Sequence, residues 1–111
     1  MAAELTFDTA LGIPQADGTV GINAYCENPG IPEIEVFRVT SDASGDYFFS
    51  RRFKKIKSVL IQNHGATFAT GAARDPPKLT ITQGSATATG KLTITHTTTE
   101  EVFSVIVFGE I

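Results

Sequence analysis

Apolar and polar residues alternate with a period of two along most of this 111-residue chain. That period places apolar side chains on one face of an extended strand. Threonine, valine, isoleucine and phenylalanine, which suit a pleated and half-buried surface, are common, and glycine and proline clusters interrupt the pattern at short intervals. No clean 3.6-residue apolar period extends over about ten residues. We therefore expect one all-β domain over residues 1–111, an antiparallel β-sandwich or jelly-roll-like fold of about eight short strands.

The alternation also assigns residues to strands and faces. In the strand expected over 19–26 it turns Ile22, Ala24 and Cys26 inward, so the chain's one cysteine is predicted to be a small buried hydrophobe. The strand expected over 56–63 is predicted to be the central one. The other expected strands are 4–9, 33–40, 46–53, 78–83, 91–97 and 102–108, with a short strand between 83 and 90.

Three segments are apolar on both faces, unlike a strand with one face in water. They are Val59–Ile61, Tyr47–Phe49 and Val105–Phe108. If Phe103, Val105 and Val107 point into the core, then Ile106 and Phe108 point out, and contiguous exposed apolar patches usually mark contact sites. We expect Ile106, Phe108 and Leu60 to form an oligomer interface, unless a loop over residues 64–77 covers that face.

The five-residue segment Lys-Leu-Thr-Ile-Thr occurs twice, at 78–82 and 91–95. It predicts two amphipathic strands with leucine and isoleucine inside and threonine outside, rather than a duplicated functional unit. The second half of the chain should therefore have a polar but uncharged surface. The threonines expected to form this surface are Thr80, Thr82, Thr93, Thr95, Thr97, Thr98 and Thr99.

Charge is segregated along the chain although the net charge is only −3. Five of the nine basic residues lie in one block, namely Arg51, Arg52, Lys54, Lys55 and Lys57, whereas the first fifty residues are strongly acidic. Clustered charge of this kind favours docking on an acidic protein surface. A solvated strand edge is the simpler alternative. Nucleic-acid binding is disfavoured because the sequence pI is about 5.2.

The sequence contains no motif that indicates catalysis. Two histidines and one cysteine are too few, and too far apart, for a zinc site. The segment Asp42–Asp46 places two carboxylates around a glycine, which is more typical of a tight polar turn than of a calcium loop. We expect no enzyme activity, no catalytic residues, no metal and no cofactor. The first residues do not resemble a secretory signal, and no apolar run reaches the ~18 residues of a membrane helix, so we expect cytoplasmic synthesis and no membrane partner.

Two segments resemble a known class of proteins. Phe53-Lys54-Lys55-Ile56-Lys57-Ser58-Val59-Leu60-Ile61-Gln62-Asn63 and Glu101-Val102-Phe103-Ser104-Val105-Ile106-Val107-Phe108-Gly109 are similar in style to minor structural proteins of tailed bacteriophage virions, above all capsid decoration or cement proteins. The resemblance implies a β-sandwich or jelly roll, often trimeric, that binds the major capsid protein or another virion protein and stabilises the shell. The alternatives are a tail, fibre or baseplate β-domain, and a small glycan- or ligand-binding module.

Overall fold

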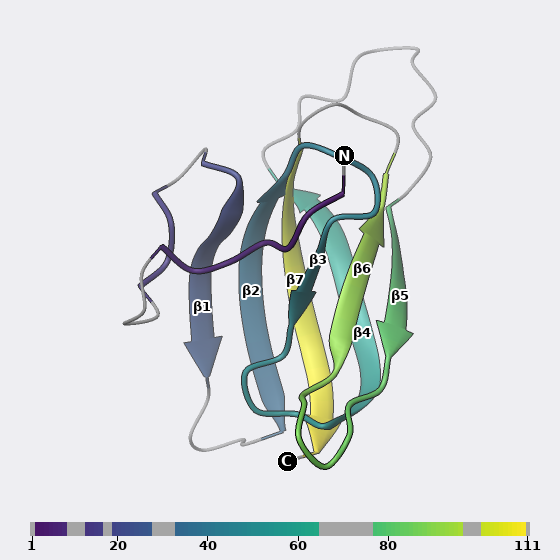
Figure 1. Ribbon diagram of the computed structural model, residues 1–111. Coiled ribbons are helices and arrows are strands. Elements are labelled where there is room, and N and C mark those ends of the chain that lie inside the picture. Colours follow the sequence, from purple (N-terminus) through teal and green to yellow (C-terminus); the bar gives the residue numbers. More distant parts are fainter. Residues whose placement is uncertain are drawn as a thin grey trace.

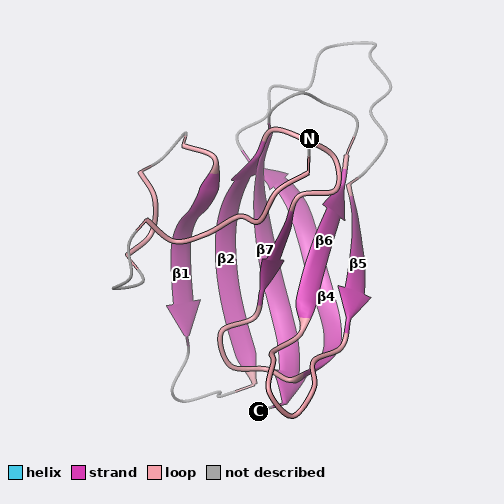
Figure 2. Ribbon diagram, viewed as in Figure 1, coloured by secondary structure: helices cyan, strands magenta, loops and turns pink. Residues whose placement is uncertain are grey.

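The computed structural model describes residues 2–8, 13–16, 19–27, 33–64, 77–96 and 101–110. Within these ranges the chain is all-β, without a helix, as expected (Figure 2). Seven strands form two antiparallel sheets, in the orders β1-β2-β7-β4 and β3-β6-β5 (Figure 1). Their bounds are β1 (Gly21–Glu27), β2 (Ile34–Ser41), β3 (Tyr47–Phe49), β4 (Lys55–His64), β5 (Lys78–Thr82), β6 (Lys91–Thr95) and β7 (Glu101–Glu110).

The three-stranded sheet lies over one face of the four-stranded sheet (Figure 1). One cluster of buried side chains fills the space between them. Strand β7 lies inside the larger sheet, paired with β2 and β4, and contributes Phe103, Val105 and Val107, all 0% exposed. Phe48, Leu92 and Ile94 face them from the smaller sheet. The hydrophobic effect acts on this cluster as a whole and is the main force holding the two sheets together.

Three strand predictions are wrong. The segment 56–63 belongs to β4, which is an edge strand of the four-stranded sheet, because β7 pairs between β4 and β2. Over residues 4–8, the part of the expected strand 4–9 that the structure describes, the chain makes one isolated bridge, between Glu4 and Tyr47. Residues 83–90 contain no strand and form the connection between β5 and β6.

The prediction that Cys26 is buried is also wrong. Ile22 pairs with Val39 and Ala24 pairs with Arg38, so Asn23 is an extra residue that shifts the register of β1. Such a bulge reverses the face on which the following side chains lie. Ile22 is buried as expected, but Ala24 and Cys26 are exposed on the opposite side of the sheet.

A buried carboxylate fixes the orientation of β2. Glu35 is 0% exposed, and its side chain accepts hydrogen bonds from the Tyr25 hydroxyl, the Ser50 hydroxyl and the main-chain N–H of Arg52. The Nε atom of Arg52 lies 3.7 Å from Oε2 of the same carboxylate. These groups replace the water that an ionised carboxylate loses on burial. The Glu35 carboxylate thereby links β1 and β2 to the segment that follows β3.

That segment, residues 50–56, crosses from one sheet to the other and is bonded to both. Ser50 donates its N–H to Gly90 O and Gly90 donates to Phe53 O, while the Lys54 N–H donates to Glu110 O. The side-chain amide of Gln83 accepts from the Ile56 N–H at 2.7 Å and donates to the Ile56 carbonyl at 2.9 Å. The Gln83 side chain thus makes the pair of hydrogen bonds to Ile56 that the main chain of a neighbouring strand residue would make. It thereby connects the end of β5 to the start of β4.

The two Lys-Leu-Thr-Ile-Thr segments are neighbouring antiparallel strands, with Thr80 opposite Thr93. Leu92 and Ile94 are fully buried, whereas Thr80, Thr82 and Thr95 are exposed. The predicted alternation is therefore confirmed for the described threonines. Thr97, Thr98 and Thr99 lie outside the described residues.

The Glu35 contacts predict a large change in stability. Glu35→Gln removes the charge that its donors complement and should lower the free energy of unfolding by about 2 kcal/mol. Glu35→Ala leaves the Arg52 guanidinium without its carboxylate and should cost about 3–5 kcal/mol. Chemical denaturation monitored by circular dichroism measures both. The matched control is Glu33→Gln, an exposed carboxylate two residues earlier; a loss as large as that of Glu35→Gln would contradict the assignment.

Candidate functional site

The larger sheet has an apolar outer face, the side turned away from the three-stranded sheet. The strand register places Cys26 beside Val36, Val36 beside Ile106, and Ile106 beside Leu60. These four side chains therefore form one row across all four strands, at right angles to the strand direction. Leu60 is 60% exposed and Val36 is 37% exposed.

The neighbouring rows differ in polarity. On one side, Ile34 pairs with Phe108 and Phe108 with Ser58, which extends the apolar surface by two large side chains. On the other side lies a mainly polar row of Ala24, Arg38, Ser104 and Gln62. A shallow depression of about 380 Å³ lies between β4 and β7, lined by Leu60, Ile61, Gln62, Ser104 and Ile106.

The three residues predicted as an oligomer interface thus lie together on the outer face. Ile106 is paired with Leu60, and Phe108 follows two residues along β7 on the same side. Sequence reasoning missed Ile34 and Val36 as part of this face. Ile34 and Val36 alternate with Glu35, and a glutamate is normally expected to face water. The sequence therefore shows that Ile34 and Val36 point outward only if the Glu35 carboxylate is known to be buried.

The basic block is dispersed, because it lies mainly in the crossing segment between the sheets. Arg52 is tied into the fold, donating from Nη2 to the Ile34 carbonyl at 2.8 Å. The Lys57 ammonium lies 3.2 Å from the Glu110 carboxylate, and Lys54 Nζ donates to the Ala86 carbonyl at 3.0 Å. Lys55 is exposed. The block therefore presents separate charges along one end of the molecule rather than a single patch.

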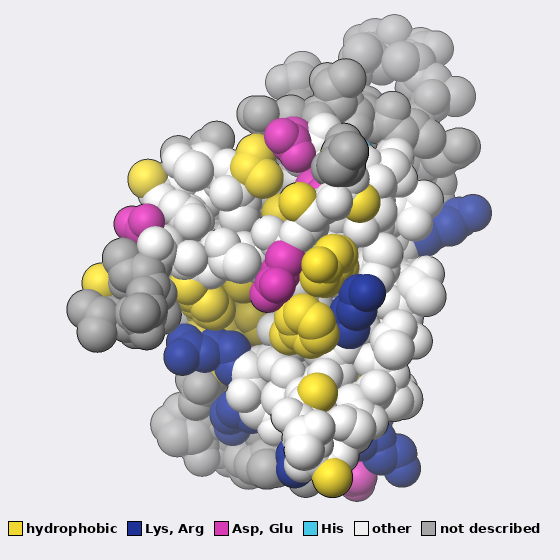
Figure 3. Space-filling model, viewed as in Figure 1, with side chains coloured by type: hydrophobic (Ala, Val, Ile, Leu, Met, Phe, Trp, Pro, Cys, Tyr) yellow, Lys and Arg dark blue, Asp and Glu magenta, His cyan; other side chains and the backbone are white. Residues whose placement is uncertain are grey.

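Arg51 points to a different surface, the open side between β1 and β3. Its guanidinium carbon lies 4.7 Å from the ring centre of Phe7 and 5.1 Å from that of Tyr25. A cation over aromatic faces is stabilised by the ring quadrupoles. Figure 3 shows hydrophobic side chains in a recess on this side, with basic and acidic groups at its margin.

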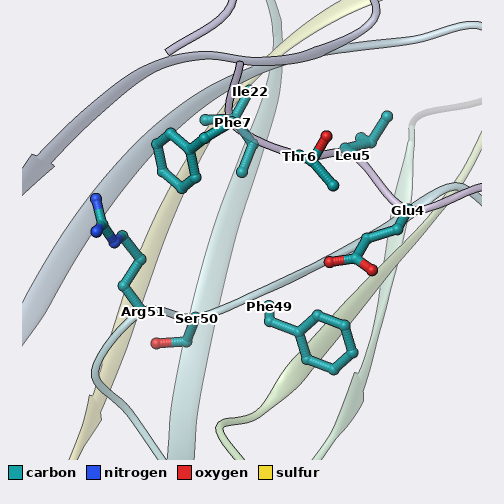
Figure 4. A pocket seen from close by; sticks show the side chains of 8 residues that line it. All are labelled: Glu4, Leu5, Thr6, Phe7, Ile22, Phe49, Ser50 and Arg51. Atoms are coloured by element: carbon teal, nitrogen blue, oxygen red, sulfur yellow. The ribbon is translucent and has the colours of Figure 1, made fainter. Parts of the chain in front are cut away.

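The recess is a groove of about 240 Å³ beneath the N-terminal segment. Glu4 and Phe49 lie on one side of it, and Phe7, Ile22 and Arg51 on the other (Figure 4). Phe49 is 36% exposed, and both Glu4 and Arg51 are exposed. The groove therefore offers an apolar wall with one acidic and one basic group at its rim.

One buried cluster contains the residue types of a hydrolase but not the arrangement. The Ser41 hydroxyl lies 2.8 Å from His96 Nε2 and donates to Asp46 Oδ2 at 2.8 Å. In a catalytic triad the histidine stands between serine and carboxylate, whereas here the serine does. All three residues are buried, and Asp46 also accepts from the Ala3 and Ala43 N–H groups. The cluster closes a turn, which agrees with the polar turn predicted over Asp42–Asp46.

His96 comes directly after β6 and continues the inward face of Leu92 and Ile94. The apolar alternation of 91–95 predicts this side, together with partial exposure at the strand end. The predicted exposure is wrong, because His96 is only 6% exposed. The His64 side chain lies outside the described residues.

Among the described residues, no three histidine, cysteine, aspartate or glutamate side chains are grouped so that they could hold a metal ion. The same part of the chain contains no helix long and apolar enough to cross a membrane. The sequence matches no protein-family model and no curated protein, and the structure matches no solved structure. The candidate surfaces are therefore judged on their own geometry.

The contacts of the basic block predict unequal effects of removing its members. Arg52→Ala should lower the free energy of unfolding by about 2–3 kcal/mol, because it deprives the buried Glu35 carboxylate of a charged partner. Lys55→Ala, at an exposed position in the same block, should change stability by no more than about 0.5 kcal/mol. Denaturant melts of both variants test the difference. Equal effects would mean that Arg52 is a surface residue like Lys55.

Proposed function

We propose that this chain is a non-enzymatic structural protein with a β-sandwich or jelly-roll-like fold, which works as a subunit of a larger assembly. The virion is the setting that its sequence style favours, with a capsid decoration or cement role. One observation carries the proposal: the four-stranded sheet bears large apolar side chains on both faces, and only one face is covered by the smaller sheet.

The outer face is too apolar to be explained as ordinary surface. Single exposed hydrophobic residues are common on monomers, but contiguous patches usually mark contacts. Here Val36, Ile106 and Leu60 are adjacent in one row, and Ile34 and Phe108 are adjacent in the next. Complete burial of one such side chain stabilises an assembly by about 2 kcal/mol. The outer face is therefore the surface through which the subunit would be held.

The basic end of the molecule would supply the second contact. Lys54, Lys55 and Lys57 are all exposed there. These positive charges attract an acidic protein surface. The attraction reaches about one Debye length, about 8 Å at physiological ionic strength, and becomes shorter as salt is added. An acidic region on a capsid shell is the partner that this end fits.

Association with particles tests the virion proposal. The chain is co-expressed with the major shell protein encoded in the same genome, and the particles are sedimented at low and at high salt. We expect the chain in the particle fraction. The triple variant Lys54→Gln, Lys55→Gln, Lys57→Gln should occupy fewer sites and lose most of the salt dependence.

The control is Lys78→Gln, which removes an exposed charge from the smaller sheet. Equal occupancy by the triple variant and the wild type would refute docking through the basic end. Absence of the chain from shells, together with its presence in tail fractions, would favour a tail, fibre or baseplate domain instead.

The groove beside Arg51 supports a second candidate, a small glycan- or ligand-binding module. An exposed aromatic ring with charged groups at the rim is a common arrangement for holding a small polar ligand. On a glycan array this function predicts selective binding that Arg51→Ala abolishes while Lys55→Ala preserves it. An array without signal for the wild-type protein would remove the glycan form of this candidate.

A further inference from the structure

We propose that the occupant of the outer face is the same face of a second copy, packed sheet on sheet about a two-fold axis that runs along the strands. The inference rests on the proposed function, because it assumes that the outer face is buried in an assembly. It adds the identity of the partner, the symmetry and the residues that meet.

The form of the surface favours a two-fold pair. A two-fold contact uses the same patch on both subunits, whereas a closed trimer needs two different, complementary patches. The central row of the outer face, from Cys26 to Leu60, is one continuous apolar patch spanning all four strands. The outer face of the other sheet carries only the aromatic pair Tyr47 and Phe49, on the three-residue strand β3, beside exposed threonines such as Thr80. It therefore does not match a patch that spans four strands. A pair is therefore expected in place of the trimer that the resemblance implies.

The row pattern selects the direction of the axis. An axis along the strands keeps every row opposite the same row of the partner copy, while β1 faces β4 and β2 faces β7. Val36 then meets Ile106 of the partner copy, and the polar row that contains Arg38 meets another polar row. An axis along the central row would instead place Ile34 opposite Arg38 of the partner copy, an apolar residue against a charge.

Shape and area also fit this packing. The depression between β4 and β7 lies opposite β1 and β2 of the partner copy, so Val36 of that copy is placed to fill it. Four strands about 4.8 Å apart and seven to ten residues long have a footprint of about 550 Å². Side-chain relief adds to that area, which approaches the roughly 800 Å² per partner of a typical stable interface.

The first experiment measures native mass by light scattering after size exclusion, at low and high salt. We expect twice the 11.8 kDa chain mass at both, because an apolar interface is not screened. Leu60→Lys should weaken the dimer by at least about tenfold, a change of about 1.4 kcal/mol. Thr80→Lys, which adds the same charge to the outer face of the smaller sheet, should leave the dimer intact.

The second experiment fixes the axis by cross-linking. Sheets that pack face to face are about 10 Å apart, beyond the reach of a disulfide, so a short bis-maleimide is used. An axis along the strands brings Cys26 opposite residue 60 of the partner copy. Leu60→Cys in the native background should therefore give a covalent dimer linked between positions 26 and 60. The wild type and the double variant Cys26→Ser, Leu60→Cys should give little.

The outcomes separate the two proposals. A dimer with the 26-to-60 linkage supports both the partner and the axis. A dimer that cross-links between the two Cys26 residues, or that gives no cross-link at either pair of positions, overturns the axis along the strands. The outer face remains the contact in that case if Leu60→Lys weakens the dimer. A monomer or a trimer overturns the two-fold pair. Only a chain that neither self-associates nor binds particles overturns the proposed function as well.

Discussion

Burial of the Glu35 carboxylate determines which way the larger sheet faces. Side chains alternate along a strand, so an inward Glu35 requires Ile34 and Val36 to point outward. Paired residues on neighbouring strands point to the same face of a sheet. Ile106 and Leu60 therefore also point outward, because Val36 pairs with Ile106 and Ile106 pairs with Leu60. A shift of one residue in β2 would bury these apolar side chains and expose the carboxylate. The apolar outer face is thus a consequence of how one acidic residue is satisfied.

The same carboxylate accounts for the basic segment. Arg52 is held against Glu35 and the Ile34 carbonyl, which anchors the chain where it crosses between the sheets. The charges on either side of Arg52 are thereby directed to different surfaces, Arg51 toward the groove and Lys54 toward the connection between β5 and β6. A block that is continuous in sequence becomes one structural residue and several separate surface charges.

Much of the fold was predictable because strand alternation is a local property. The repeated segments, the inward Phe103, Val105 and Val107, and the outward Ile106 followed from period two alone. The exposure of Cys26 did not, because one extra residue at Asn23 reverses the face, and a bulge leaves no reliable signal in a single sequence. Strand order was equally hidden, since pairing depends on contacts between distant segments. The groove beside Arg51 depends on the path of the N-terminal segment, which no local pattern specifies.

The two outward faces of the molecule act as a comparison within one structure. Both belong to antiparallel sheets that cover the same core. Apart from the aromatic pair on β3, one presents threonines and lysines, which hydrogen-bond to water, whereas the other presents Val36, Ile106 and Leu60. A general need for strand-forming residues would explain either face, since threonine and valine both suit strands. It does not explain why an apolar row crosses all four strands of one face only. Removal of that row from water in the proposed assembly would explain it, because only there does an apolar side chain stabilise the protein.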